Sequence, residues 1–397
     1  MKLSAALLSL MLCCNAAAAD MRVKALQSKQ PSTSQPGVTA NSITIGSLAP
    51  LTGENAETGN AVKAVLTAYF DDLNQRGGIY QRRIVLRFAE SGESSAATLK
   101  NAKRLAATPV FAMVAPFVPD AEQKLAAVAQ ASKIPLVGLL ALSVPSEPVN
   151  REVFYLLPGF QQLEQELVRF AAAREKSAME KTAVVVADSK LQTDVAAAMQ
   201  ATWKELSFEK PQEFVLSAAK AEEMVSDLHS QGFERVFFIG DGEQLGPWIQ
   251  AADKAEWAPK VFVLGPLLDG SILGAPARFQ GRIFAAYPQL QPEMGAVDEF
   301  DYFLNSHNLA SDHRLVQISA YCAAKILVEA LARAGKNVTR EKLIQTLEQM
   351  RDFRTGLLPG ITFGANRRVG SFKAEIVCVD LTSHSFQQEC SKTAKPE

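Results

Sequence analysis

Apolar and polar positions follow two periods in the stretch from residue 43 to residue 79. Ile43 and Ile45 alternate with Thr44, the period of two that is typical of a short strand. Apolar residues then recur at helical spacing from Val62 to Leu73, while charged and amide side chains take the other face. The pattern predicts a strand, a polar turn and a long amphipathic helix. Free backbone N–H groups at such a helix start suit a carboxylate or another polar group.

Strands and helices continue to alternate along the rest of the chain, in two sets. Near-continuous apolar strands between amphipathic helices are typical of parallel sheets that helices cover on both faces. We therefore predict an α/β fold with two doubly wound parallel-sheet lobes. The expected strands are 83–88, 111–116 and 134–140 in the first set and 182–188, 213–218, 235–240, 260–265 and 282–288 in the second; the expected helices are 99–106, 121–132, 197–206, 223–230, 248–254, 297–308, 315–334 and 340–350.

Length and charge narrow the class of protein. The 397 residues suffice for two lobes, each with its own core. The formal net charge is -1, and Lys and Arg are scattered, so the chain lacks the basic patch that nucleic-acid or membrane-surface binding needs. We expect no nucleic-acid partner.

The N-terminus has the three parts of a secretory signal. A basic start is followed by an apolar run over 5–12 and by four alanines at 16–19. We predict a signal peptide over 1–19, cleaved before Asp20, and a flexible leader over 20–40. Cys13 and Cys14 leave a lipoprotein signal open, but the bulky Leu12 before Cys13 favours secretion without acylation.

Three further cysteines remain in the predicted mature chain. Cys378 and Cys390 flank a predicted hairpin turn, and an oxidising compartment permits a disulfide between them. Two unpaired thiols are the alternative, because pairing depends on geometry. Cys322 lies in an apolar helical segment and is most simply a buried small hydrophobic residue.

Catalytic motifs are missing from the sequence. His307 and His313 are six residues apart, which does not match the spacing of a zinc-binding helix, and no nucleophile elbow, phosphate loop or dinucleotide fingerprint joins a strand to a helix. Asp188, Asp241 and Asp269 follow predicted strands, where open α/β sheets bind ligands, although each also suits a helix N-cap. The sequence predicts a binding protein rather than an enzyme, with no cofactor and no metal.

Several motifs in fixed order carry a resemblance to a known family. The beginning of the predicted fold contains the motifs PLTG, A-x-x-G and N-x-x-GGI, followed by the basic strand QRRIVLRF. It resembles the start of type I periplasmic binding proteins. This is the branched-chain amino-acid-binding (leucine/isoleucine/valine-binding) class of ABC transporter substrate-binding proteins. The runs KIPLVGLLALSVPSEPVNREVFYLLPG, KTAVVVADSKLQTDV, VFFIGDGEQLGPWIQAA and KVFVLGPLLDGSIL follow in the family's order, so the likeness covers residue 41 to the C-terminus.

The resemblance implies how the chain is threaded and what it does. Residues 41–157 and 289–353 would form lobe one and 158–288 and 354–397 lobe two, joined by three hinge strands near 156–160, 286–289 and 351–355. The lobes would close on a small molecule by hinge motion. We expect a periplasmic monomer that delivers its ligand to an ABC-type permease, which is the family's usual role. A periplasmic ligand sensor, or an accessory subunit of a signalling or oxidase system, is the alternative.

The chain departs from the family's amino-acid site in both lobes. Where amino-acid-binding members offer a hydroxyl and backbone N–H groups to the carboxylate of the ligand, this chain has Pro116 and Phe117, and Leu142 replaces an expected threonine. The acidic partner for the ammonium group corresponds to Leu267 or Leu268, with Asp269 shifted along the chain. A buried amino acid would leave its charges unpaired, at a cost of several kcal/mol.

These departures define a candidate site. Phe117, Leu139, Leu142 and Leu267 are expected to line a mostly apolar pocket beside Pro116, with Thr52, Asn55, Thr58, Ser143, Gln192, Asp241 and Asp269 as polar neighbours. Ordinary core packing is an equal alternative for Leu139 and a weaker one for Phe117. We expect a weakly polar or aromatic organic ligand rather than leucine, isoleucine or valine.

Overall fold

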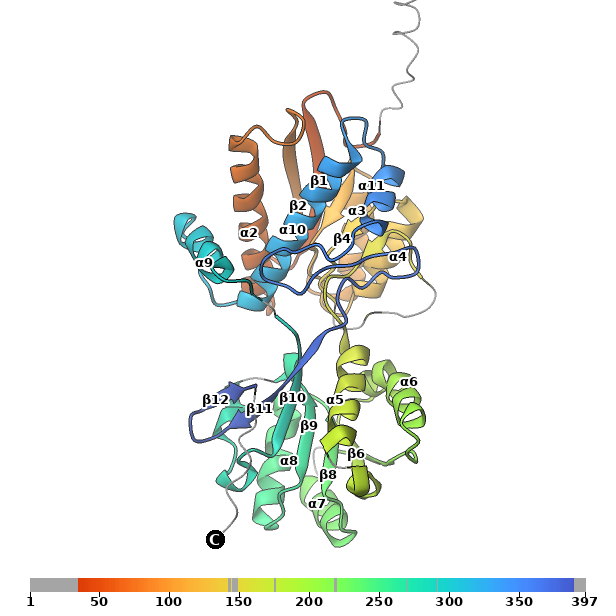
Figure 1. Ribbon diagram of the computed structural model, residues 1–397, viewed down its shortest axis with the longest axis vertical. Helices are drawn as coiled ribbons and strands as arrows, with labels where there is room; N and C mark the ends of the chain where they lie inside the picture. The colour runs from red at the N-terminus through yellow and green to blue at the C-terminus, as the bar shows by residue number, and fades with distance from the viewer. Residues whose placement is uncertain are drawn as a thin grey trace, which may run out of the picture.

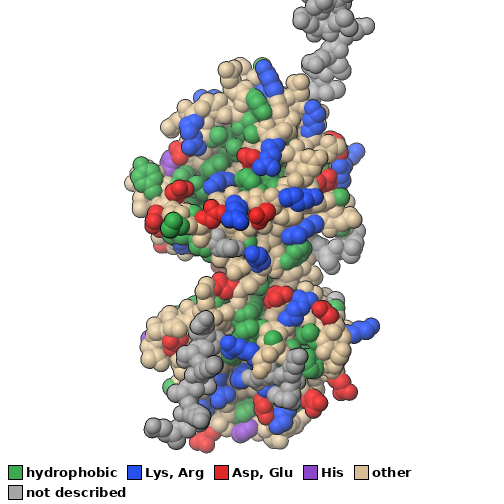
Figure 2. All heavy atoms as spheres, in the orientation of Figure 1, with side chains coloured by type: hydrophobic (Ala, Val, Ile, Leu, Met, Phe, Trp, Pro, Cys, Tyr) green, Lys and Arg blue, Asp and Glu red, His purple; other side chains and the backbone are tan. Residues whose placement is uncertain are grey.

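Two lobes stand one above the other and meet at a narrow waist in the computed structural model (Figure 1). The structure describes residues 35–141, 144, 149–174, 176–217, 220–268, 270–290 and 292–388. The predicted signal peptide and most of the predicted leader therefore lie outside the described residues. On the face shown in Figure 2, acidic and basic side chains are interspersed over both lobes.

The upper lobe in Figure 1, which is lobe one, contains a five-stranded parallel sheet in the order β2-β1-β3-β4-β5. Two hydrophobic cores lie on its two faces. Ile43 and Ile45 of β1 enter the core shared with α2 and α10, whereas Leu48 enters the core shared with α3 and α4. The elements are β1 (Ser42–Ala49), α2 (Ala56–Gln75), β2 (Arg83–Glu90), α3 (Ser95–Ala106), β3 (Ala112–Val114), α4 (Glu122–Ser132), β4 (Leu136–Val137), β5 (Val153–Phe154), α9 (Ala296–Ser306), α10 (Arg314–Ala334) and α11 (Arg340–Glu348).

Helix α10 is long and apolar enough to cross a membrane, by length and composition alone. It packs instead against α2 and the sheet of the upper lobe, and most of its apolar side chains are buried there. Cys322 is one of them, and burial raises the pKa of its thiol to about 12. The helix is thus a core element of this lobe.

The lower lobe, which is lobe two, contains a seven-stranded sheet in the order β12-β11-β10-β9-β8-β6-β7. The strands β6 to β10 run parallel, and β11 and β12 add an antiparallel hairpin at one edge. Separate cores on the two faces pack against α7 and α8 and against α5 and α6. The elements are α5 (Phe160–Arg174), β6 (Thr182–Val186), α6 (Ser189–Glu205), β7 (Gln212–Val215), α7 (Ala221–Ser230), β8 (Arg235–Ile239), α8 (Gly242–Lys254), β9 (Lys260–Leu264), β10 (Ile283–Pro288), β11 (Ala374–Asp380) and β12 (Ser385–Gln387), with short 3-10 turns η1 (Lys176–Lys181), η2 (Gly265–Leu267), η3 (Gly270–Gly274) and η4 (Ala277–Phe279).

The chain crosses between the lobes at three places within the described residues, after β5, after β10 and before β11. Backbone hydrogen bonds join these crossings: the Tyr155 N–H donates to the Arg368 carbonyl at 2.8 Å, and the Gln289 N–H donates to the Lys373 carbonyl at 3.0 Å. The ends of the lobes are thus tied together at one hinge.

The third crossing lies later in the chain than the expected 351–355. Phe353 and Ile361 exchange backbone hydrogen bonds of 2.9 Å, and Leu357, Leu358 and Ile361 are buried in the core of the upper lobe. Residues 354–371, which we expected in lobe two, therefore pack with lobe one. The chain enters the lower sheet only at β11.

Candidate functional site

The turn after β1 is held by the carboxylate that ends β2. The Leu51 and Gly92 N–H groups each donate to Glu90 at 2.7 Å. A Cβ atom at Gly59 would come within 1.7 Å of the Pro50 carbonyl oxygen, so only glycine lets α2 approach the turn this closely. The opening motif therefore fixes where α2 begins.

Polar side chains of this turn line a pocket of about 390 Å³ beside the start of α3. Thr52 and Asn55 belong to it, together with Glu54, Glu93 and Asp120. Thr58 lies elsewhere, on the first turns of α2, where its hydroxyl is 3.3 Å from Nδ1 of His313. Within the described residues, no group of three or more His, Cys, Asp or Glu side chains could hold a metal ion.

A second cavity, of about 250 Å³, lies where the two lobes meet. We call it the apolar cleft. Its lining comes from the strand-end loops of lobe one, the first turns of α10, two crossing segments and the η2 turn of lobe two. The lining residues are Phe117, Leu139, Leu140, Ala141, Leu156, Leu157, Pro158, Pro266, Pro288, Leu315, Val316 and Ser319.

None of the described residues that line the cleft is charged. The one hydroxyl among these residues, that of Ser319, donates to the Leu315 carbonyl at 2.8 Å within α10. The cleft therefore offers apolar contacts and few hydrogen-bond donors, as expected for a site that takes a weakly polar molecule.

Backbone contacts position the lobe-one side of the apolar cleft. The Phe117 N–H donates to the Leu48 carbonyl at 3.0 Å, and the Leu140 N–H donates to the Pro116 carbonyl at 3.1 Å. These bonds hold the two strand-end loops side by side, so that Phe117 and Leu139 both line the cleft. Pro116 is buried and contributes its carbonyl to this link rather than a side chain to the cavity.

The lobe-two side of the cleft comes from the η2 turn. A Cβ atom at Gly265 would lie 2.4 Å from the Tyr287 ring, so the glycine lets this turn lie close against β10. Pro266 consequently faces the cleft, while the neighbouring Leu267 packs partly buried against the lobe-two core.

Two other lobe-two candidates have local partners away from the apolar cleft. The Gln192 amide donates to Glu213 at 2.8 Å. Asp241 is the N-cap of α8, where its carboxylate accepts from the Gln244 N–H at 2.9 Å in a capping box. Leu142, Ser143 and Asp269 lie outside the described residues, as does Cys390; Cys378 is buried in β11. The disulfide therefore stays a prediction.

Sequence reasoning missed the contribution of α10 to the cleft. Leu315, Val316 and Ser319 occupy its first turns, and the hydrophobic pattern there is that of any core helix. Only the return of the chain to lobe one places these residues opposite Phe117. The predicted return of the chain to lobe one could have indicated these residues, whereas the hydrophobic pattern of the helix could not.

Comparison with protein families decides what this fold is. The family model described as "Periplasmic binding protein" matches residues 42–380. The chain belongs to the periplasmic binding protein family. The match confirms the prediction of a type I periplasmic binding protein with two α/β lobes. A search of curated proteins found no match.

Solved structures share the fold of this periplasmic binding protein at low identity. An extracellular ligand-binding receptor from Verminephrobacter eiseniae is 18% identical with a TM-score of 0.69, over 87% of this chain and 99% of that one. A branched-chain amino acid ABC transporter protein from Thermus thermophilus with bound valine is 16% identical with a TM-score of 0.67, over 87% and 95%. A fatty acid ABC transporter substrate-binding protein from Thermomonospora curvata is also 16% identical, with a TM-score of 0.68, over 87% and 90%.

Proposed function

We propose that this periplasmic binding protein closes its lobes on a weakly polar or aromatic organic molecule in the apolar cleft and presents it to an ABC-type permease. The observation that carries the proposal is the lining of the cleft. Residues from both lobes and from the crossings meet there, and none of those that the structure describes is charged. A ligand that touches both lobes stabilises the closed form by its contacts with each.

An α-amino acid fits this cleft poorly. Among the described lining residues, its carboxylate and ammonium groups would find no charged partner, and their desolvation would cost several kcal/mol. The one hydroxyl among these described residues, that of Ser319, already donates within its own helix. A ring or an aliphatic chain, by contrast, gains about 25 cal/mol for each Å² of apolar surface that it buries.

The structural neighbours are compatible with this choice. One shares the fold and binds valine, and another is named for fatty acids, at the same 16% identity to this chain. The fold therefore accommodates both kinds of ligand, and the side chains of the cleft must decide between them. Here they favour the less polar kind.

Export, the oligomeric state and the remaining candidate residues complete the proposal. Residues 1–19 would act as a cleaved signal that brings the chain to the periplasm, where it would act as a monomer. Leu142, Ser143 and Asp269, which lie outside the described residues, stay candidates for the site. The polar candidates Thr52, Asn55 and Thr58 lie on lobe one, outside the cleft lining.

A thermal-shift screen of the mature chain tests the ligand class. The panel contains leucine, isoleucine and valine, together with aromatic acids, medium-chain aliphatic acids, alcohols and amides. We expect the largest rise in melting temperature with an aromatic or aliphatic member and little change with the three amino acids. A large rise with a branched-chain amino acid would overturn the proposal. Mass spectrometry of the recovered ligand should find it unchanged, as for a binding protein rather than an enzyme.

A further inference from the structure

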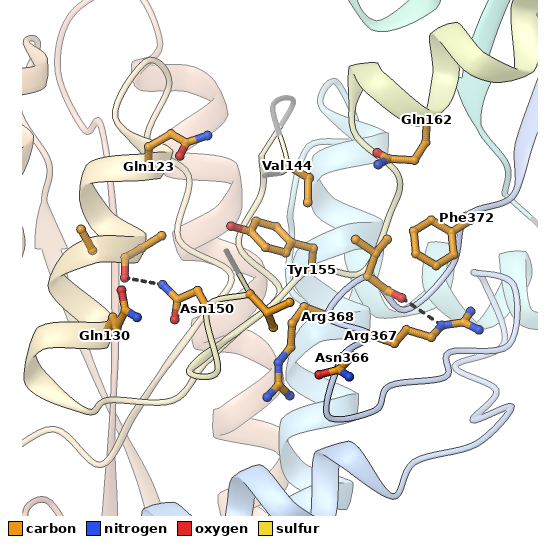
Figure 3. A pocket seen from close by; sticks show the side chains of 14 residues that line it. Gln123, Gln130, Val144, Asn150, Tyr155, Gln162, Asn366, Arg367, Arg368 and Phe372 are labelled. Atoms are coloured by element: carbon orange, nitrogen blue, oxygen red, sulfur yellow. Dashed lines mark hydrogen bonds between the residues drawn. The ribbon is translucent and has the colours of Figure 1, made fainter. Parts of the chain in front are cut away.

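A groove of about 340 Å³ lies on the other side of the hinge from the apolar cleft. We call it the hinge groove (Figure 3). Consecutive residues of the first crossing serve the two cavities: Tyr155 lines the hinge groove, whereas Leu156 lines the apolar cleft. The groove has no role in the function proposed above.

Elements from both lobes form the hinge groove. One face of α4 in lobe one, including Ala127, forms one wall, and the loop before β11, including Arg367 and Phe372, forms the other. Gln162 reaches the groove from the first helix of lobe two. A molecule in the groove therefore touches both lobes and the crossings between them.

The buried end of the hinge groove carries an unused polar group. Tyr155 is 5% exposed, and Figure 3 shows its hydroxyl pointing into the groove. No other group among the described residues forms a hydrogen bond with this hydroxyl. Burial raises the pKa of Tyr155 to about 12, so the hydroxyl keeps its proton at neutral pH and can donate it. A ligand in the groove can therefore accept a hydrogen bond from this hydroxyl.

The rim of the hinge groove carries positive charge. Arg367 is exposed, its guanidinium lies 5.1 Å from the centre of the Phe372 ring, and it has no ion pair within the described part of the chain. Its contacts with the Val369 and Gly370 carbonyls are long, at 3.4 and 3.3 Å. No Asp or Glu is among the described residues that line the groove. The surroundings thus suit an apolar body with one negative charge.

We propose that the hinge groove is a second ligand site, for a small amphiphilic anion such as an aromatic or aliphatic carboxylate or sulfonate. Its ring or chain packs on Phe372 and Val369, its acid group pairs with Arg367, and Tyr155 donates a hydrogen bond. Since the occupant bridges Gln162 of lobe two and α4 of lobe one, it restrains the crossings and opposes a change in the angle between the lobes.

Hydrogen exchange with an anionic probe locates the site. We expect 8-anilinonaphthalene-1-sulfonate to slow backbone exchange in residues 366–372 and 149–157 of the wild-type chain. Ala127→Trp fills the hinge groove from an exposed helical position and should abolish this protection. Ala201→Trp, an equally exposed helical position on α6 of lobe two, is the matched control and should behave as wild type.

The charge of the ligand is tested separately. Arg367→Gln should raise the probe concentration for half-maximal protection about tenfold, as expected for the loss of one charge-assisted contact. The neutral analogue N-phenyl-1-naphthylamine should protect the wild type less well and should be insensitive to Arg367→Gln. Protection that is absent in the wild type, or unchanged in Ala127→Trp, would overturn the site; equal protection by the neutral analogue would overturn its preference for anions. Neither result depends on the ligand of the apolar cleft.

Discussion

Phe117 is the largest side chain that lobe one contributes to the apolar cleft. It is only partly buried, and its backbone is fixed by the hydrogen bond from its N–H to the Leu48 carbonyl. Truncation to alanine should therefore weaken ligand binding more than it weakens the fold. We expect Phe117→Ala to raise the dissociation constant of an aromatic or aliphatic ligand by more than about fivefold, equivalent to about 1 kcal/mol or more.

Titration calorimetry measures this effect. Phe386→Ala removes an exposed ring from β12, away from the cleft, and should leave the dissociation constant unchanged. Equal affinity of the Phe117→Ala variant and the wild type would show that the ligand does not lie against this ring.

Glu164 is a buried acid on α5. It is 3% exposed, its Oε1 has no hydrogen-bond partner and no cation beside it within the described residues, and burial raises the pKa of its carboxyl from 4.5 to about 8. The unfolded chain releases this proton near pH 4.5, whereas the folded chain holds it up to about pH 8. Stability that is fully present below pH 4.5 is therefore lost as the pH rises through 8, at up to about 1.4 kcal/mol for each pH unit.

Denaturant unfolding at pH 4.5, 6.5 and 8.5 tests this linkage. Glu164→Gln keeps a neutral side chain at every pH, so its free energy of unfolding should match the wild type at pH 4.5 and exceed it at pH 8.5. Glu166→Gln changes an exposed position on the same helix and should follow the wild-type profile. A constant difference between Glu164→Gln and the wild type would show that Glu164 does not titrate as described.

Single residues also show where sequence reasoning stops. The apolar candidates Phe117 and Leu139 line the cleft, because large apolar side chains at strand ends have few other places to go. Polar candidates such as Asp241 and Gln192 are satisfied by neighbours in their own segments. A polar side chain at the end of a strand serves a cap as readily as a ligand, and the sequence does not separate the two roles.

At the scale of elements, the helices and strands follow the hydrophobic period, and side-chain caps mark the starts of α3, α8 and α11. Helix α10 was expected over 315–334 and runs over Arg314–Ala334. Helix α8 was expected to begin at Trp248, after Pro247, but begins at Gly242 behind the Asp241 capping box, with the proline inside it. The capping interaction outweighed the helix-breaking tendency of the proline.

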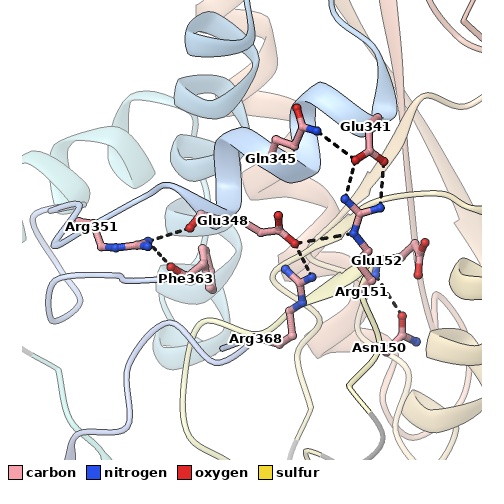
Figure 4. Close-up of polar contacts among 9 residues, drawn as sticks. All are labelled: Asn150, Arg151, Glu152, Glu341, Gln345, Glu348, Arg351, Phe363 and Arg368. Carbon is pink, nitrogen blue, oxygen red and sulfur yellow. Dashed lines mark hydrogen bonds and ion pairs between the residues drawn. The ribbon is translucent and has the colours of Figure 1, made fainter. Parts of the chain in front are cut away.

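An ion-pair network fixes α11 to the loops beside it (Figure 4). Glu348 accepts a hydrogen bond of 2.7 Å from Arg368, which lies over the Phe154 ring, and it lies 3.8 Å from Arg151. The Arg368 side chain is 7% exposed, and its Nε and Nη1 have no hydrogen-bond partner within the described residues. The loop that leads to the third crossing is held to lobe one by this contact.

Loss of Glu348 should therefore destabilise the protein. Glu348→Ala leaves the Arg368 guanidinium buried and unpaired, and we expect the free energy of unfolding to fall by about 3 kcal/mol. The exposed pair between Arg333 and Glu329 is the control: Glu329→Ala should cost less than about 1 kcal/mol. Urea unfolding of both variants measures the difference, and equal losses would mean that burial of the pair does not matter.

At the scale of the molecule, two α/β lobes were predictable from the sequence because each lobe repeats the strand–helix period. The positions at which the chain crosses back from one lobe to the other were not predictable from this period. Residues 354–371 have little regular periodicity, and their apolar side chains could serve either lobe; packing of Leu357 and Ile361 beside α10 decides for lobe one. The apolar cleft depends on this threading, which explains why only its loop residues were predicted.

Closure on a weakly polar ligand is the central claim, and small-angle X-ray scattering tests it most directly. The mature chain is measured alone, with saturating leucine, and with the tightest aromatic or aliphatic ligand from the thermal-shift screen. We predict that the radius of gyration falls with that ligand and stays unchanged with leucine. An unchanged radius with a saturating, tightly bound ligand, or compaction by leucine, would contradict the account.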